Sequence, residues 1–301
     1  GNVLFNGERP SNKADSMYTQ LSRIPAGNVE RIEIVDGATL DIPGLSGQVA
    51  NIVYRAAAFS GQFSWKPEFR AHHTDPLLTR ADVSIRGSAG RVEYEAALSN
   101  DDSARSGAGG LTLIADGAGN IVERRQDVWN THYDSPKLSG RVKWTAPGGS
   151  IVNFGGHYQR QYYRYDEDGV RMAPGQADRL RTVRDTENTC NYELGGDWQF
   201  GLGPGKLKLI GLRRFSHEPY SQEVVTRFAD GAPPTGDRFR QTGKLGETIA
   251  RGEYQWKMFG GDWQLSGEAA FNKLDNVASI GVLVPGSGFV DQPFPGGTGG
   301  V

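Results

Sequence analysis

The sequence predicts a mainly β protein, in which a small mixed segment of strands and helix (residues 1–60) precedes about nine antiparallel strands (residues 61–301). Glycine supplies 42 of the 301 residues, twice the usual share of about 7%, and no collagen repeat accompanies it. Aromatic residues make up 10% of the chain. From residue 61 onward, polar and apolar residues alternate in one segment after another. Tight turns between half-buried strands account for these observations together.

Composition and charge exclude several classes of protein. Lys and Arg number 33 against 35 Asp and Glu, so the net charge of −2 gives no bulk attraction for nucleic acid. The single cysteine, Cys190, cannot form a disulfide within the chain. No apolar run approaches the ~20 residues of a membrane-spanning helix, whereas membrane strands, being only half apolar, remain possible. Because the first residues lack an apolar signal region, we expect either a cytoplasmic protein or an internal piece of a longer one.

The first 60 residues contain the signals of a compact motif. "VLF" ends at Asn6–Gly7, a dipeptide typical of a hairpin turn. Apolar residues recur at helical spacing within 13–23, just before Pro25. "RIEIV" and "QVANIV" alternate as strands, and Asp36–Gly37 turns the chain between them. We therefore expect strand, helix, strand and strand in this order.

From residue 61, strands and connections follow a regular scheme. The connections after the second, fourth, sixth and eighth strands are tight and rich in glycine. Those after the third, fifth and seventh are long, and we expect loops at 100–136, 166–185 and 216–245, the first with a hairpin of its own. Alternating short and long connections are typical of outer-membrane β-barrels. The nine strands are expected near 61–71, 79–87, 91–99, 137–146, 151–165, 186–200, 206–215, 246–258 and 262–273.

The polarity of the strands favours a barrel in a membrane over a soluble one. In "KLSGRVKWTA", Leu138, Val142 and Trp144 share one face, whereas Arg141 and Lys143 share the other. A soluble barrel or sandwich also alternates in this way. Indole, however, prefers the boundary between water and lipid, and four tryptophans lie near tight turns on the apolar side of their strands. They are Trp144, Trp198, Trp256 and Trp263.

The opening segment resembles a known family. "IPAGNVERIEIVDGATLDIPGLSGQVANIVYR" is similar to the second half of the plug domain of TonB-dependent outer-membrane receptors. The resemblance implies a mainly β fold, in which residues 1–60 are the C-terminal part of an α+β plug domain. Residues 61–301 are then the N-terminal antiparallel strands of an incomplete transmembrane β-barrel. The matching positions are Ile24–Pro25, Val29–Val35, Gly37, Gly44, Gly47 and Val49–Val53.

The resemblance also implies a function in transport. Receptors of this family take up a scarce nutrient, by default a ferric siderophore, across the outer membrane of a Gram-negative bacterium. Outer loops and the plug bind the ligand, and a TonB-type energy-transducing complex of the inner membrane moves the plug. The implied partners are this complex, the nutrient and outer-membrane lipid. The complex would act through a segment ahead of this one, so the chain is expected to be an internal fragment.

Three residues of the plug motif are expected, from the resemblance, to meet the barrel wall. They are Glu30, Arg31 and Glu33. Charged residues of the right parity on the expected strands are their candidate partners, and surface charge on a strand is the alternative. The candidate partners are Arg141, Lys143, Glu193 and Arg251.

The expected outer loop from Arg160 to Arg184 carries the candidate ligand-binding residues. Tyrosine and arginine together suit an anionic or aromatic ligand. A solvated loop with an aromatic girdle is the alternative. The candidates are Tyr162, Tyr163, Arg164, Tyr165 and Arg171.

Other clusters point to no reaction. His72, His73 and Asp75 lack a further metal ligand, and Asp166–Gly169 lacks the spaced ligands of a calcium loop. The sequence has no nucleophile elbow, phosphate-binding glycine loop or Cys/His ligand set. We therefore expect no enzyme activity, no metal and no cofactor. Two alternatives to transport stay open: a soluble all-β ligand-binding module of carbohydrate type, and a secreted β-rich hydrolase.

Overall fold

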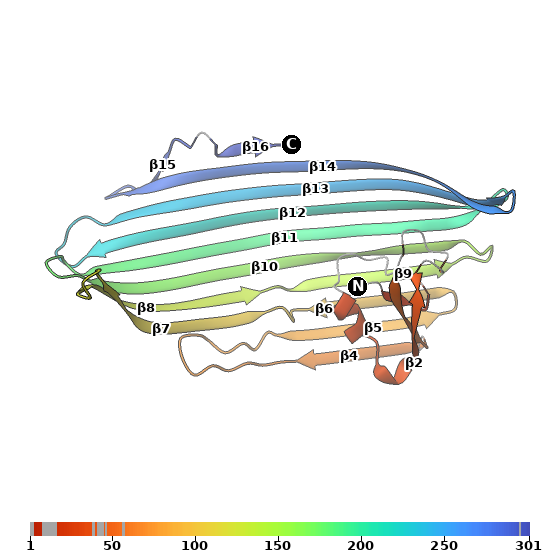
Figure 1. Cartoon of the computed structure of the whole chain (residues 1–301), viewed down its shortest axis with the longest axis horizontal. Coiled ribbons are helices and arrows are strands. Elements are labelled where there is room, and N and C mark those ends of the chain that lie inside the picture. The colour runs from red at the N-terminus through yellow and green to blue at the C-terminus, as the bar shows by residue number, and fades with distance from the viewer. Residues whose placement is uncertain are drawn as a thin grey trace.

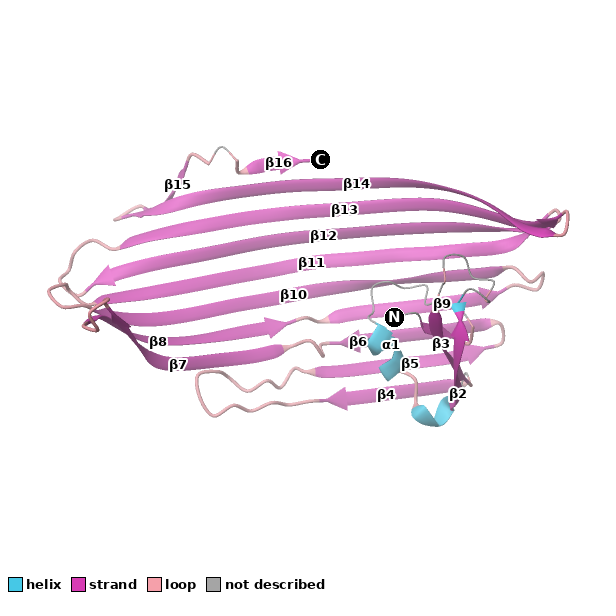
Figure 2. Ribbon diagram, in the orientation of Figure 1, coloured by secondary structure: helices cyan, strands magenta, loops and turns pink. Residues whose placement is uncertain are grey.

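The computed structural model describes residues 3–7, 17–37, 40, 45, 47–55, 58–294 and 296–301. Within them the chain is mainly β, with one large antiparallel sheet and a small sheet of three strands (Figures 1 and 2). The small sheet and two short helices come from the N-terminal residues and lie at the end of the large sheet where its shorter strands are (Figure 1). No helix in the described residues is long and apolar enough to span a lipid bilayer.

The small sheet contains β1 (Val3–Phe5), β2 (Val29–Asp36) and β3 (Gln48–Tyr54), in the order β1-β3-β2. β2 pairs antiparallel with β3, whereas β1 pairs parallel with it. The helix α1 (Met17–Ser22) and the 3-10 turn η1 (Ala26–Asn28) separate β1 from β2 in the chain. The strands expected from "RIEIV" and "QVANIV" are thus confirmed.

Two expectations for this segment need comment. The turn at Asn6–Gly7 exists, since both residues have positive φ angles, 50° and 80°. The hairpin that it signalled is wrong for β1, whose partner in the described residues is the parallel strand β3. The expected helix at 13–23 is confirmed over Met17–Ser22, and its earlier positions lie outside the described residues, as does Gly44 of the family motif.

Apolar side chains on both faces of β3 hold the small sheet together. Leu4, Leu45 and Val49 form one buried cluster. Ile52, on the other face of β3, packs with Phe5 in a second cluster that α1 covers. Burying a side chain of this size contributes about 1.5–3 kcal/mol. The two clusters therefore fix the strands and α1 as one unit.

The large sheet is a meander of antiparallel strands. Its main path runs in the order β15-β14-β13-β12-β11-β10-β9-β6-β5-β4, and β16 pairs with β14. β8 pairs with β10 beyond the end of β9, and β7 pairs with β8. The strands are β4 (Phe59–Trp65), β5 (Ala81–Ala89), β6 (Val92–Ser99), β7 (Ala104–Ala115), β8 (Ile121–Asp134), β9 (Lys137–Thr145), β10 (Ile151–Met172), β11 (Arg179–Leu202), β12 (Gly205–Phe228), β13 (Thr235–Met258), β14 (Gly261–Val284), β15 (Gly288–Gln292) and β16 (Thr298–Gly300).

The nine expected strands are all present, and the expected hairpin within 100–136 is β7 with β8. Two of the expected long loops are wrong. Residues 166–185 and 216–245 mostly continue the neighbouring strands and leave only short turns at 173–178 and 229–234. Polar side chains occur on both faces of these extensions, so a regular alternation of polar and apolar residues is missing from the sequence. Backbone hydrogen bonds between neighbouring strands extend the strands through these residues, for example where Tyr165 lies opposite Asp185.

The register gives the large sheet one polar face and one apolar face. Lys143 lies opposite Asn153, which lies opposite Asp197, on the polar face. On the apolar face, Trp144 lies opposite Val152. The assignment of faces from the sequence is therefore confirmed, and it extends across neighbouring strands.

Arg23 joins the small sheet to the polar face of the large sheet. Its side chain is 4% exposed, and its guanidinium lies 3.3 Å from the Glu95 carboxylate and 4.0 Å from that of Asp82. Glu95 also pairs with Arg86 at 2.9 Å and with Arg141 at 3.3 Å. A buried charge is tolerated when it is paired in this way. The small segment is thus attached through charge to the polar side of the sheet.

Candidate functional site

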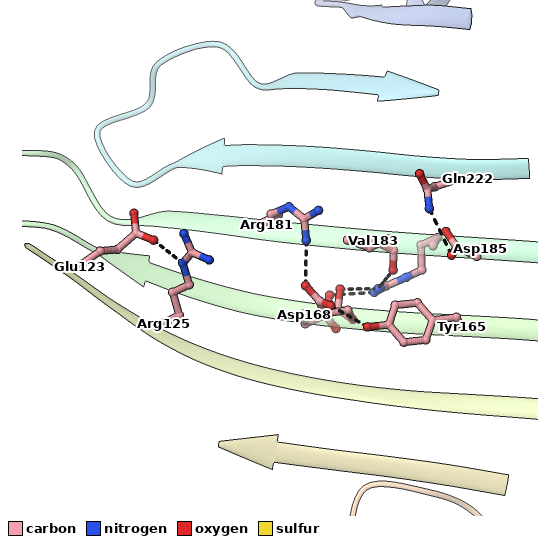
Figure 3. Close-up of polar contacts among 10 residues, drawn as sticks. Glu123, Arg125, Tyr165, Asp168, Arg181, Val183, Asp185 and Gln222 are labelled. Carbon is pink, nitrogen blue, oxygen red and sulfur yellow. Dashed lines mark hydrogen bonds and ion pairs between the residues drawn. The ribbon is translucent and has the colours of Figure 1, made fainter. Parts of the chain in front are cut away.

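The polar face continues into the long hairpins and gathers charged and aromatic side chains there. Every second residue of a strand points to the same face, so Tyr165, Glu167 and Arg171 of β10 face the same side as their cross-strand partners on β8 and β11. Figure 3 shows part of this group. The hairpin cluster, as we call it, consists of Glu123, Arg125, Asp127, Trp129, Tyr165, Glu167, Arg171, Arg179, Arg181, Asp185 and Gln222.

Glu167 is held from two sides at the centre of the cluster. Arg181 Nη1 donates to Glu167 Oε1 at 2.8 Å, and the Tyr165 hydroxyl donates to Oε2 at 2.6 Å. The Tyr165 ring stacks on Trp129, with centroids 6.1 Å apart and planes inclined by 28°. Burial raises the pKa of the Tyr165 hydroxyl, and its hydrogen bond to Glu167 raises it further. Tyr165 is therefore a neutral hydrogen-bond donor at neutral pH.

Glu123 binds two arginines at the outer end of the cluster. Arg125 Nε donates to Glu123 Oε1, and Arg179 Nη2 donates to Oε2 at 2.7 Å. Figure 3 shows the first of these contacts. The hydrogen bond from Arg125 lowers the pKa of the Glu123 carboxyl, and Arg179 lowers it further. One ionised acid thus serves two cations.

Arg171 lies between those two arginines. It is directly opposite Arg125 on β8 and directly opposite Arg179 on β11. Like charges in this arrangement destabilise a sheet. Both neighbours turn to Glu123, and no described residue forms a hydrogen bond or ion pair with the Arg171 guanidinium, whose Nε is buried. Burial lowers the pKa of Arg171, and the charges of Arg181 and Arg125 lower it further.

Asp127 lies beside Arg171 and over a glycine. Its cross-strand partner is Gly169, where an added Cβ would collide with Asp127 Oδ1. Any larger residue at position 169 would therefore displace the carboxylate. Asp127 Oδ1 is buried and has no hydrogen-bond partner within the described residues. The acceptor Asp127 Oδ1 and the donor Arg171 Nε therefore both lack a partner, although their residues are neighbours.

Asp185 occupies the inner side of the cluster. Gln222 Nε2 donates to Asp185 Oδ2 at 3.3 Å and to the Tyr220 hydroxyl at the same distance (Figure 3 shows the first contact). Burial raises the pKa of the Asp185 carboxyl, and hydrogen bonds from Gln222 and Tyr220 oppose the rise. The carboxyl is therefore less acidic than an exposed one.

The structure divides the five candidate ligand-binding residues between two faces. All five lie on β10, so their placement in an outer loop is wrong. Tyr163, Tyr165 and Arg171 are on the polar face, and Tyr165 and Arg171 belong to the hairpin cluster. Tyr162 and Arg164 are on the opposite face, where Tyr162 is 44% exposed and Arg164 pairs with Asp166. The structure does not bring these two to the cluster.

The sequence did not indicate the partners that β8 supplies. Asp127 and Trp129 lie more than 30 residues before Tyr165 in the chain, and only the pairing of β8 with β10 brings them together. The hairpin around "GAG" gave the position of β8, but its register with β10 was not readable. The glycine at 169 was the one local signal, because glycine inside a strand often marks a close approach.

The three acidic and basic residues of β2 have their contacts inside the small sheet. Arg31 pairs with both Glu30 and Glu33, and Glu30 pairs with Arg55. Glu33 also accepts a hydrogen bond from Asn51. The expected meeting of Glu30, Arg31 and Glu33 with the wall is therefore not seen among the described contacts. Arg23 makes this connection instead.

The clusters considered for metals form other contacts. His132 Nε2 lies 3.7 Å from Asp75 Oδ2. Asp166 pairs with Arg164 and Arg184, and Asp168 pairs with Arg184 at 2.8 Å. In the part of the chain that the structure describes, no group of three or more His, Cys, Asp or Glu side chains is arranged to hold a metal ion.

A scan against protein-family models finds no match to this chain, and a search of curated proteins finds no match either.

Proposed function

We propose that the protein takes part in TonB-dependent uptake of a scarce nutrient across the outer membrane of a Gram-negative bacterium. A ferric siderophore is the default ligand, and a TonB-type complex of the inner membrane supplies the energy. In this proposal the large sheet is barrel wall and the small sheet is part of a plug. The observation that carries it is the pairing of an apolar face with a polar face against which the small sheet is held.

The spacing of aromatic pairs along the apolar face supports the proposal. Trp256 stacks near Trp263 close to one tight turn, and Tyr192 contacts Phe215 further along. Phe215 lies opposite Gly246, ten residues along β13 from Trp256, which is about 33 Å of strand. With the usual tilt of about 40° this becomes about 25 Å, the height of the apolar band of outer-membrane barrels. Aromatic rows at both borders are typical of such bands.

The polar face supports the other half of the proposal. A wide barrel has a lumen that side chains cannot fill, and a folded segment must close it. The Arg23 contact with Glu95 and Asp82 holds the small sheet on this face, and the Arg86 guanidinium lies over the Tyr54 ring of β3, 5.6 Å from its centroid. Separating these charges costs little when the segment moves, because their hydration in water offsets the attraction that is lost, whereas a shared apolar core could not separate cheaply. Such an attachment suits a plug that must be displaced.

The hairpin cluster lies beyond the upper aromatic row. Tyr192 marks this row on β11, and Asp185 and Arg181 follow towards the far turn. In the proposal these parts of the hairpins stand outside the membrane, where a nutrient first meets the protein. Ligand capture there, followed by movement of the plug, needs no bond to be made or broken.

Fractionation tests the proposal. The protein is expressed from its complete reading frame in a Gram-negative host, and the envelope is separated on a sucrose gradient with markers for both membranes. We expect it in the outer-membrane fractions and soluble only in detergent. A monomer that is stable in buffer without detergent would refute the transporter and favour the soluble ligand-binding module.

A further inference from the structure

Asp127 and Arg171 are the two charged residues of the hairpin cluster for which no hydrogen bond or ion pair is found among the described residues. Asp185 Oδ1 and Arg179 Nε also lack a partner, but Asp185 accepts from Gln222 through Oδ2 and Arg179 donates to Glu123 through Nη2. Arg125 and Arg179 share Glu123, and Arg181 binds Glu167. Asp127 Oδ1 and Arg171 Nε are both buried, and neither has a hydrogen-bond partner in the described residues. Leaving a buried charged group unmatched is costly. A ligand that supplied a donor to Asp127 and an acceptor to Arg171 would remove this cost.

The backbone keeps the two groups on one face of the sheet and apart from each other. Asp127 is opposite Gly169 and Arg171 is opposite Arg125, so the two are diagonal neighbours on β8 and β10. Diagonal Cα atoms in a sheet are about 7–8 Å apart, which is within reach of long side chains. Gly169 is necessary because a Cβ there would displace the Asp127 carboxylate.

The chemistry of the pair defines what fits between them. An arginine guanidinium donates in a fork that matches an oxyanion. An ionised aspartate only accepts, so it needs a donor such as a hydroxyl. Trp129, two residues from Asp127 on the same face, stacks with Tyr165 and supplies an apolar wall.

We propose that Asp127 and Arg171 recognise a ligand that carries an acid group next to a hydroxyl group, the chemistry of hydroxy acids and acidic sugars. Arg171 binds the acid, Asp127 accepts from the hydroxyl, and the ring or carbon chain lies towards Trp129. The inference rests on the proposed function only for the use of this site in uptake. Binding itself is a property of the hairpins.

The test is equilibrium binding of glucuronate to the purified chain in detergent, measured by titration calorimetry. Glucose lacks the acid group, and cyclohexanecarboxylate lacks the hydroxyls, so each probe removes one half of the recognition. We expect glucuronate to bind at least tenfold more tightly than either. Binding no tighter than cyclohexanecarboxylate, or no binding, would overturn the inference.

Matched variants assign the binding to the pair. R171Q is expected to weaken glucuronate at least tenfold, and D127N is expected to weaken it several-fold without changing volume. R164Q is the control, because Arg164 lies on the same strand but on the opposite face, paired with Asp166. R171K keeps the charge in case R171Q does not fold, and it should retain part of the binding. Equal losses in R171Q and R164Q would show a bulk charge effect and overturn the inference.

The two proposals fail separately. An outer-membrane protein that ignores glucuronate would overturn the inference and leave the proposed function standing. A protein soluble without detergent that binds glucuronate through Arg171 would support the inference and refute the transporter.

Discussion

Arg23 links the small sheet to the large one through its side chain. Its guanidinium lies among carboxylates of β5 and β6, although in the sequence it is only the residue after a short helix. The prediction of a contact with the wall was made for Glu30, Arg31 and Glu33, because they lie in a more recognisable motif. Residues two apart on a strand share a face and meet each other first, as Arg31 and Glu33 do at 2.7 Å. The sequence indicates such local pairs, but it does not indicate which charged residue of the small sheet contacts the large sheet.

Replacing Arg23 by Met should loosen the small sheet without unfolding the large one. Glu95 would keep Arg86 and Arg141 as partners, so we expect a moderate loss of about 1–3 kcal/mol in the attachment. Amide exchange should accelerate in β1, β2 and β3 and stay unchanged in β11 to β14. Arg55→Met is the control, since Arg55 is exposed and pairs with Glu30 inside the small sheet. Equal exchange rates in both variants would contradict the role of Arg23.

Asp185 should make stability depend on pH. Burial raises its pKa in the folded protein, so its contribution to stability is fully present below the unfolded pKa and is lost as pH rises through the folded value. Asp185→Asn keeps an oxygen for Gln222 and removes this loss. We expect the variant to be more stable than the wild type at about pH 7 and to show no such gain at about pH 3. Thermal unfolding across this range, with Asp168→Asn as control, measures it, and a gain independent of pH would refute the assignment.

β10 shows where sequence predicts an element and where it stops doing so. Its first half alternates between polar residues such as Asn153 and apolar ones such as Phe154, and its start was predicted correctly. Its second half has Arg164 on one face and Tyr165 on the other, both in polar contacts. Alternation is visible only where one face is apolar, so the end of the strand was predicted too early.

Adjacent residues of β10 also test what the apolar face contacts. Phe154 is 56% exposed on that face, whereas Asn153 is on the polar face, bonded to Asp197 at 3.1 Å. If the apolar face lies in lipid, Phe154→Arg should cost about 2–4 kcal/mol. Asn153→Arg places the same charge next to Asp197 and should cost much less. Urea titration in phospholipid vesicles compares them, and equal midpoints would argue against a membrane-spanning sheet.

The two-part organisation of the whole molecule was readable from the sequence. A compact glycine-punctuated segment followed by alternating strands predicts a small sheet before a large antiparallel one, and both are found. The relation between the parts was not readable, because it depends on contacts such as Arg23 with Glu95, 72 residues apart. Only part of the hairpin cluster could be predicted from the sequence, for the same reason. Tyr165 and Arg171 lie in a conspicuous local run, while Asp127 reaches them only through register.

The strands found in place of the expected loops lower the entropy cost of binding the proposed ligand. Fixing the backbone of one residue costs about 1–2 kcal/mol in entropy at 25 °C, and a loose loop would meet that cost at the moment of binding. Here these residues are already ordered in the ladder of β10, β11, β12 and β13, so the loss of backbone entropy belongs to folding and not to binding. A ligand bound by Asp127 and Arg171 as we propose would contact side chains on an already ordered sheet. Its heat-capacity change on binding should then reflect only the apolar surface buried at the contact, without a contribution from chain ordering.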